Sequence, residues 1–487
     1  MLQKVKQPGW LWLVVVVLLV AGVATRMTAT VDADPSLKGY EANIDGFILD
    51  ELATQPRADV FVKMADDADL TAAAAIADRV QRLNNVHDTL TAQASQSQAA
   101  LLRWLDQQGI RYQSYWINNS VLVYDADLAL VQTLAARSDV AYVRGNHLVE
   151  MIWPVSQEPA PAAAEAIEWG VQKIRANLVW STGNTGQGIV VSSIDSGTRY
   201  THNALIGKYR GNNGDGTFTH DYNWYDPSFT YAVPTDPLGH GTHTMGTMVG
   251  DDGGSNQIGV APGAKWMTAG LGTIPTDSEL IAAAQWILCP TRVNGSDPNC
   301  AMAPHVVNNS WGGGGGDPWY QSYVNAWVAA GIIPVFSIGN SGSSCNTAGS
   351  PGDYANVFGI GATNSSDLLA SFSSKGPGQF RLLKPDFVAP GENVRSSVNS
   401  GDNAYGVYSG TSMAAPHMVG TIALMLSAQP NLTMSQIYGV LAYTSQRNLG
   451  APPGPDSCLR PYNQYPNPIY GFGQIDAYAA VDFVNGP

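Results

Sequence analysis

Short apolar runs alternate with helical patterns from residue 187 onward, and this alternation limits the folds that the chain can adopt. The strand-like runs, apolar at most positions, are 188–195, 303–310, 332–340 and 356–363. The segments with apolar residues at helical spacing are 278–288, 319–331 and 421–429. Strands that are apolar on both faces occur in parallel sheets covered by helices on each side. We therefore expect an α/β domain of three layers with a mainly parallel sheet over residues 167–487.

A smaller unit with a different pattern precedes this domain. Its elements, in order, are expected to be a strand at 58–64, a helix at 70–109, two short strands within 114–125, a helix at 126–139 and a closing strand within 140–152. This βαββαβ order predicts a small α+β module of ferredoxin-like layout over 58–153. Residues 154–166 are rich in Pro and Ala, a composition typical of a linker.

The N-terminus carries the pattern of an export signal. Lys4 and Lys6 precede an apolar run over 10–24, and small residues follow it. An uncleaved membrane anchor is the alternative, because no clean cleavage site follows the run. We predict a signal peptide or anchor over 1–25 and leave 26–57 unassigned. The protein is then secreted or extracytoplasmic, or else anchored in the membrane and facing outward.

Overall composition excludes some classes of partner and of structure. The net charge of −14 argues against nucleic acid as the main partner. An apolar content of 45% with only 13% charged residues is enough to form a sizeable core and argues against disorder. These numbers describe an acidic, folded protein.

Three separate segments place chemically useful side chains next to small residues. Asp195 is the last residue of the strand-like run 188–195. A carboxylate in such apolar surroundings is costly unless a partner uses it. His240 leads the helical stretch "HGTHTMGTMVG", and Ser412 lies at the start of another helix in "YSGTSMAAPHMVG". A helix start favours developing negative charge. Together these residues provide an orienting carboxylate, a general base and a nucleophile. A turn role for Asp195 and a capping role for Ser412 remain the simpler alternatives.

The second histidine of the same stretch, His243, is expected to be structural. The pair His240 and His243 lacks the spacing and the Glu of a zinc-peptidase motif, so we expect no catalytic metal.

Taken together, "IDSGT", "HGTHTMGT" and "GTSMAAPH" resemble the three signature blocks of the subtilisin-like serine proteases (subtilases). The resemblance extends from about residue 166 to the mid-440s, and "NWYD", "QIGVAPGAKW" and "VVNNSWGGG" look most like the bacillopeptidase F type. It implies a subtilisin-like fold and a catalytic triad of Asp195, His240 and Ser412. The module 58–153 is similar in layout to the inhibitory propeptide of the family, which implies self-processing within 154–166.

The resemblance also implies roles for residues around the triad. Asn340, in "VFSIGNSG", matches the residue that stabilises the oxyanion, where a neutral amide adds no charge. Asn309 does not match it. Glycine-rich walls leave room for substrate backbone and for a large side chain, so broad specificity with a large apolar residue before the scissile bond is expected. The residues of the expected walls are Ser310, Trp311, Gly312, Gly313 and Gly339.

The four cysteines allow three pairings, and free thiols are a further alternative. Cys289 and Cys300 bracket a polar, turn-rich loop that a bridge would close, which would leave Cys345 with Cys458. An exported protein can form such disulfides.

The remaining expectations concern ligands and partners. Subtilases need no cofactor for catalysis but often bind calcium, and the oxygen-rich turns 210–217 and 251–257 are weak candidates with no ligands assigned. Expected partners are polypeptide substrates and the chain's own propeptide, and we expect a monomer. Two alternatives stay open: a membrane-anchored processing protease of narrow specificity, and an inactive binding protein on the same fold.

Overall fold

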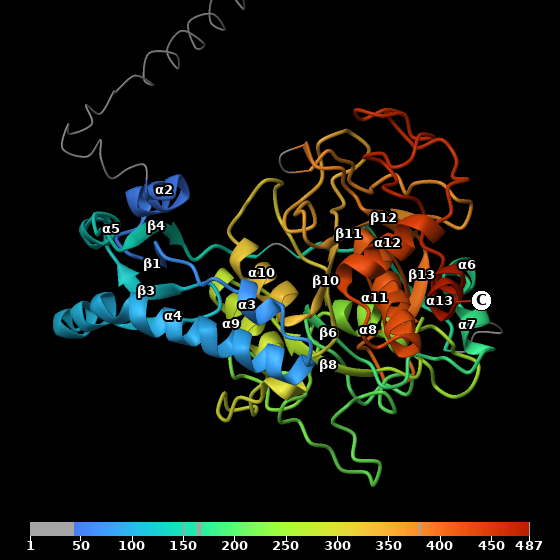
Figure 1. Ribbon diagram of the computed structural model, residues 1–487, viewed down its shortest axis with the longest axis horizontal. Coiled ribbons are helices and arrows are strands. Elements are labelled where there is room, and N and C mark those ends of the chain that lie inside the picture. Colours follow the sequence, from blue (N-terminus) through green and yellow to red (C-terminus); the bar gives the residue numbers. More distant parts are fainter. Residues whose placement is uncertain (1–42, 150, 163–166, 379–380, 487) are drawn as a thin grey trace, which may run out of the picture.

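The computed structural model describes residues 43–149, 151–162, 167–378 and 381–486. The region predicted to be a signal peptide or anchor, residues 1–25, lies outside them. The chain forms a small α+β module and a larger α/β domain that lie side by side (Figure 1). In the unassigned region 26–57, the described part forms a helix, α2 (Gly46–Thr54), that packs on the module.

The module has the order of elements that the sequence predicts. Its elements are β1 (Ala58–Met64), α3 (Thr71–Ala74), α4 (Arg79–Gln108), β2 (Tyr112–Tyr115), β3 (Ser120–Ala126), α5 (Leu128–Ala135) and β4 (Val140–Gly145). The strands form an antiparallel sheet in the order β2-β3-β1-β4. The one helix expected over 70–109 is interrupted, because the Asp78 side chain accepts a hydrogen bond from Gln81 N and starts α4 as a separate helix.

The larger domain contains a seven-stranded sheet in the order β12-β11-β10-β9-β6-β8-β7, with every pair parallel. The strands are β6 (Val190–Asp195), β7 (Trp224–Tyr225), β8 (Lys265–Gly270), β9 (Val306–Asn309), β10 (Ile333–Ser337), β11 (Phe358–Thr363) and β12 (Phe387–Pro390). The predicted parallel sheet is confirmed. The sequence patterns missed the short strand β7 at one edge, β12 at the other, and β8 next to β7.

Helices cover both faces of this sheet. The helices are α6 (Trp169–Lys173), α7 (Ala176–Trp180), α8 (His240–Val249), α9 (Asp277–Leu288), α10 (Gln321–Ala330), α11 (Thr411–Ala428), α12 (Met434–Thr444) and α13 (Ala477–Asn485). One core packs α8, α11, α12 and α13 against side chains such as Val191 and Val335. A second core packs α9 and α10 against Ile194 and Phe336, on the opposite face (Figure 1). Neighbouring strand residues thus alternate between the two cores.

The segment expected to be a linker is not irregular throughout. Residues Ser156–Ala160 form a strand, β5, that pairs antiparallel with β14 (Tyr405–Ser409). With β13 (Val394–Ser397) they make a three-stranded sheet in the order β13-β14-β5. Pro159 is tolerated because β5 is the edge strand, where one missing N–H leaves the rest of the sheet intact. Residues 163–166 of the expected linker lie outside the described part of the chain.

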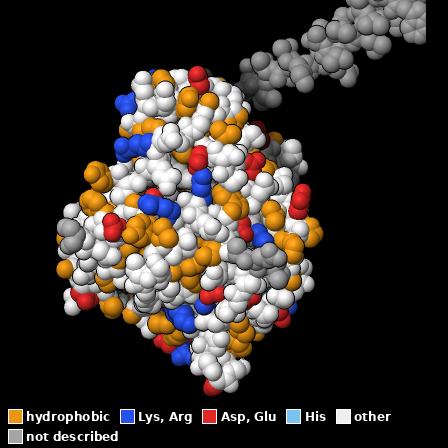
Figure 2. Space-filling model, turned by 90° about the vertical axis from the view of Figure 1, so that its right-hand side faces the viewer, with side chains coloured by type: hydrophobic (Ala, Val, Ile, Leu, Met, Phe, Trp, Pro, Cys, Tyr) orange, Lys and Arg blue, Asp and Glu red, His pale blue; other side chains and the backbone are white. Residues whose placement is uncertain are grey.

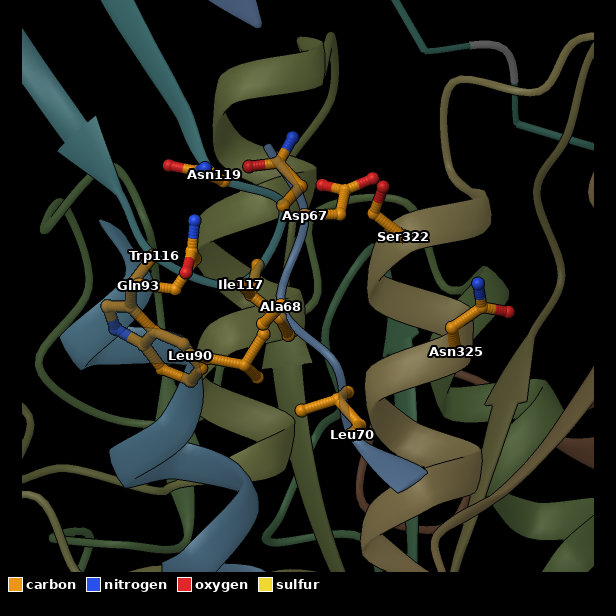
Figure 3. A pocket seen from close by; sticks show the side chains of 11 residues that line it. Asp67, Ala68, Leu70, Leu90, Gln93, Trp116, Ile117, Asn119, Ser322 and Asn325 are labelled. Carbon is orange, nitrogen blue, oxygen red and sulfur yellow. The ribbon is translucent and has the colours of Figure 1, made fainter. Parts of the chain in front are cut away.

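The module docks on α9 and α10. One face of its sheet, including Phe61 and Leu122, shares a core with these two helices. Arg144 contacts Asp317 at 3.0 Å, and Arg79 donates to Pro304 O at 2.6 Å. A small, partly open cavity of about 70 Å³ lies in this interface, between the module and α10 (Figure 3). Its lining residues are Asp67, Ala68, Leu70, Leu90, Gln93, Trp116, Ile117, Asn118, Asn119, Ser322 and Asn325.

The surface mixes charges of both signs. On the face shown in Figure 2, the described Lys and Arg side chains are scattered among acidic and uncharged groups and form no continuous stripe.

Close packing of α11 against α8 and the segment after it generates a stability prediction. A Cβ added at Gly420 of α11 would lie 2.4 Å from Val260 Cβ, whereas one added at Gly439 of α12 would meet nothing within 4 Å. We expect Gly420→Ala to lower the free energy of unfolding by about 1–3 kcal/mol. Gly439→Ala should raise it by up to about 1 kcal/mol, because alanine favours the exposed helix.

Denaturant unfolding of both variants measures these changes, in a background that carries Ser412→Ala, the substitution expected to remove any peptidase activity. An unchanged midpoint for Gly420→Ala would show that the helices can separate without cost.

Candidate active site

Asp195 ends the central strand β6, at the carboxyl edge of the parallel sheet. Its side chain is fully buried. The carboxylate accepts hydrogen bonds from His240 Nδ1 at 2.7 Å, from its neighbour Ser196 N at 2.8 Å and from Thr244 Oγ1 at 3.1 Å. Ligand sites of α/β folds gather at this edge because the helix that follows each strand starts there. The structure therefore brings Asp195 and His240 together as the sequence predicts.

His240 is the first residue of α8, and its position depends on an acid that the sequence reasoning missed. The residue before it, Gly239, has φ +83° and no side chain to cap the helix. Asp236 caps it instead, by accepting from Gly239 N and from Thr242 N, each at 2.8 Å. Asp236 also accepts from Ser196 Oγ at 2.8 Å. An acid four residues before a helix-leading His was the available sequence signal.

Two glycines allow α8 to approach the end of β6. A Cβ on Gly241 would lie 2.0 Å from Gly197 O and 3.1 Å from Asp195 Cβ. Gly197 itself has φ +121°, which disfavours any larger residue. Both positions belong to the blocks "IDSGT" and "HGTHTMGT", so their small residues have a packing reason: they let Asp195 and His240 meet.

The surroundings of His240 favour its charged form. Burial acts to lower its pKa, but the charge of Asp195 and the hydrogen bond to it, with a smaller contribution from Asp236, raise the pKa above the ordinary value. Its second ring nitrogen, Nε2, is buried and has no hydrogen-bond partner among the described residues. That nitrogen is the atom through which His240 can take up a proton.

Ser412 is the second residue of α11. Its Oγ donates to Ile152 O at 2.6 Å rather than to His240. Ile152 belongs to the segment that connects the module to β5, so the chain itself lies over Ser412. The ring of the next residue, Trp153, packs edge-on against His240 with centroids 5.7 Å apart. His240 and Ser412 thus face the same short peptide segment.

Asn340 follows β10 and contacts the same segment. Its Nδ2 donates to Trp153 O at 2.9 Å. Its Oδ1 accepts from Thr411 N at 2.9 Å and Thr411 Oγ1 at 2.8 Å. These two contacts cap α11, whose N-cap residue Gly410 has no side chain, and they direct the amide N–H groups toward the peptide.

The two functional groups therefore contact different peptide carbonyls. Ser412 contacts that of Ile152, and Asn340 contacts that of Trp153. Between them the chain makes a tight turn, in which Trp153 N donates to Met151 O at 2.9 Å. Pro154 follows, with no N–H. In this arrangement no single carbonyl contacts both Ser412 and Asn340.

Of the residues expected to form the substrate walls, Ser310, Trp311 and Gly312 contact this segment, and Gly313 continues the same stretch. Met151 bridges to Trp311, and Ile152 N donates to Ser310 O at 3.3 Å. A Cβ on Gly312 would lie 3.4 Å from Ile152 Cδ1, and one on Gly313 would meet nothing within 4 Å. The indole of Trp311 is fully buried below the wall.

Gly339 is the exception among the expected wall residues. It adjoins Asn340, but its carbonyl accepts from Ser374 N at 3.0 Å, away from the segment.

His243 points away from the site. Its Nε2 lies 3.0 Å from Val394 O and its ring stacks on Tyr408. Burial lowers its pKa to about 3, so it is neutral. Asn309, which does not match the oxyanion residue of the family, donates to Val307 O and Val335 O within the sheet.

The cysteines are paired as Cys289–Cys300 and Cys345–Cys458. The Cys289–Cys300 disulfide closes the polar, turn-rich loop between these two residues. The second joins the loop after Asn340 to the C-terminal segment. Among the described residues, three potential metal ligands lie close together: His87, Cys289 and Cys300. The sulfurs of the two cysteines form a disulfide with each other.

The two turns considered for calcium use their oxygens internally. Asp215 accepts from Thr217, and Asp252 accepts from Gly254 and Asn256. In the described chain neither turn gathers three acidic side chains. Structural calcium stays a prediction, and nothing below depends on it.

Comparison with known proteins decides the family. Residues 186–473, more than half of the chain, match the sequence model of the subtilase family. The chain belongs to the subtilases. This subtilase is 37% identical to bacillopeptidase F of Bacillus subtilis over 448 residues, which cover 87% of this chain and 30% of that protein. It is 32% identical to subtilisin E of the same species over 321 residues, covering 66% of this chain and 74% of that protein. The chain thus spans less than a third of bacillopeptidase F.

A solved structure has the same fold. Fervidolysin from Fervidobacterium pennivorans, a keratinolytic enzyme related to subtilisin, superposes with a TM-score of 0.60 at 20% identity, covering 88% of this subtilase and 61% of that chain. Within the described residues of this subtilase, no helix is long and apolar enough to cross a membrane.

The Asp236 carboxylate leads to a prediction on pH. Neutral His240 is the form that accepts a proton, so activity should fall as the pH drops through its raised pKa. Asp236→Asn removes a nearby negative charge that favours the imidazolium. We expect the acid limb of the kcat/KM profile to move to lower pH, measured with a soluble peptide substrate.

Ser196→Ala is the matched control, since it removes a hydrogen bond to Asp236 but no charge. Its acid limb should stay closer to that of the unmodified enzyme. A shift of the Asp236→Asn limb to higher pH would contradict this account of His240.

Proposed function

We propose that this subtilase is an exported serine endopeptidase, made as a self-processed zymogen. The observation that carries the proposal is the peptide segment around Ile152 and Trp153. It lies between Ser412, His240 and Asn340, with the His240 imidazole bound to buried Asp195. A polypeptide backbone is thus what the site accommodates, next to the groups needed to cleave one.

In the proposed mechanism, Ser412 Oγ attacks the carbonyl carbon of the scissile bond while His240 Nε2 takes its proton. Asp195 holds the imidazole through Nδ1 and stabilises the imidazolium. The oxyanion is stabilised by Asn340 Nδ2 and by the Ser412 backbone N–H at the start of α11. His240 then gives the proton to the leaving amine, and water hydrolyses the acyl-enzyme by the same steps in reverse.

The walls support a preference for a large apolar side chain before the scissile bond. Gly313 has open space around it, and the Ile152 side chain lies against Gly312. Ser310 and Pro275 contact the segment through backbone atoms. The carbonyl of Pro275 accepts from Val149 N at 2.8 Å. Backbone contacts do not select side chains, which supports broad specificity.

The module is proposed to act as inhibitor and folding aid. It holds the segment across the site in a turn in which Ser412 and Asn340 contact different carbonyls, which opposes reaction. Its docking contacts, such as those of Arg144 with Asp277 and Asp317, hold α9 and α10 in place. In the chain these two helices connect the strands β8, β9 and β10 of the large sheet. Cleavage within 154–166 would separate the two parts.

Export and oligomeric state complete the proposal. Two disulfides with no free cysteine among the described residues fit an oxidising compartment. We propose that residues 1–25 direct export, as a cleaved signal or as an anchor, and that the enzyme is a monomer acting on polypeptides. N-terminal sequencing of the secreted protein distinguishes signal from anchor.

Replacing the nucleophile tests self-processing. Ser412→Ala should accumulate as a chain that still carries the module, whereas the unmodified protein should lose it, because no other group in the site can attack the peptide. Mass spectrometry of the two secreted proteins measures this. A Ser412→Ala chain of mature size would mean that another protease does the processing. Absence of Ser412 labelling by a fluorophosphonate in the mature protein would favour the inactive binding protein instead.

Replacing Asn340 tests the oxyanion role separately from its capping role. Asn340→Ala and Asn340→Asp both remove the N–H donor. Both should lower kcat by about 10²–10³-fold, the range measured for such a change in subtilisin itself. Asp keeps an oxygen that can accept from Thr411, so only Ala should also lower stability, by about 1 kcal/mol. Equal kcat for Asn340→Ala and the unmodified enzyme would exclude the oxyanion role.

A further inference from the structure

The chain downstream of the active site runs along the edge of another strand for its full length. β5 pairs antiparallel with β14 in an unbroken register, from Ser156 opposite Ser409 to Ala160 opposite Tyr405. On its other side β14 pairs with β13. β14 is therefore an interior strand only while β5 is present. Once β5 leaves, the strand edge of β14 has unpaired backbone groups.

This edge is continuous with the active site. Val155 N donates to Ser409 O at 2.7 Å, two residues after Trp153, whose carbonyl contacts Asn340. Ser409 in turn lies three residues before Ser412. A peptide that leaves the site in the direction of β5 thus meets β14 at once.

The far end of the edge has a buried cation. Arg395 is 8% exposed, and its Nη2 donates to Pro161 O at 2.7 Å. Its guanidinium lies 4.1 Å over the ring of Tyr405. Arg395 Nε and Nη1 are buried and have no hydrogen-bond partner within the described chain. These two N–H groups can still donate to an acceptor brought by a ligand, such as a carbonyl or carboxylate oxygen.

We propose that the edge of β14, ending at Arg395, is a binding strip for the downstream half of a polypeptide substrate. We place the scissile bond after the residue that occupies the position of Trp153, whose carbonyl contacts Asn340. The third to the seventh residue after that bond then add a strand to β14, as β5 does here, and the eighth reaches Arg395. Pairing through the backbone gives affinity with little demand on sequence. One position is restricted: Ala160 packs with Tyr405, Ala204 and Ile258, so the seventh residue must be small.

This inference rests on the proposed function and on the release of β5. It deepens that function by naming the substrate class: extended polypeptides with at least eight residues beyond the cut. Short peptides would use only the contacts around the site itself.

The test compares peptides that share the residues before the bond but end two or eight residues after it. The full chain is expressed, and the active enzyme that it yields is used. We expect kcat/KM to be about tenfold higher for the long peptide, since several backbone hydrogen bonds more than offset the ordering of the added residues. Methylation of single backbone nitrogens of the long peptide should lower its kcat/KM by about fivefold, but only at every second position. The reason is that a strand presents every second N–H to its neighbour.

A variant tests the far end. Arg395→Gln should reduce the ratio of long-peptide to short-peptide kcat/KM, whereas Arg292→Gln, in the exposed loop between Cys289 and Cys300, should leave the ratio unchanged.

Three outcomes would overturn the inference. Equal kcat/KM for both peptides would do so while leaving the proposed peptidase activity standing. An active enzyme in which residues 156–160 still pair with 405–409 would show that β5 stays in place. Cleavage of neither peptide would remove the proposed function and the strip together.

Discussion

Two helices without caps of their own determine how this site is built. α8 and α11 begin after Gly239 and Gly410, which have no side chain to satisfy the first N–H groups. Asp236 supplies the missing acceptor for α8, and Asn340 supplies it for α11. Each acceptor has a second function near the peptide: one charge favours the imidazolium of His240, and one amide contacts a carbonyl. Capping and chemistry therefore use the same atoms.

This arrangement makes the site depend on the completed fold. Asp195, His240, Asn340 and Ser412 come from four separate parts of the chain, and each is placed by a contact with another. Ser196 links Asp195 to Asp236, and Thr411 links Ser412 to Asn340. Contacts between distant segments form slowly, because the loops between them must close first. A separate module that docks on α9 and α10 stabilises the side of the sheet opposite to α8 and α11.

Signals contained within one segment were readable from the sequence. The βαββαβ order and the parallel sheet have local patterns. So do the position of Asp195 at the end of a strand and that of Ser412 at the start of a helix. Features that depend on a distant partner were not. The role of Asp236 was missed because it depends on Thr242 and Ser196. Residues 156–160, with Pro159, read as linker because their strand exists only through pairing with 405–409. The interruption near Asp78 was missed because alanine-rich sequence masks a cap.

The sheet of the module has two different faces, and this would give the proposed activation a direction. Val60 and Val62 face the core that the module forms by itself, whereas Phe61 and Leu122 face the core shared with α9 and α10. A released module keeps only the first core and exposes the second to water. Its folded state then loses much of the apolar burial that held it together. Separation converts a stable partner into a marginally folded fragment, so rebinding competes with unfolding and degradation. If the module acts as the proposed inhibitor, the interface that delays activity would also make its onset hard to reverse.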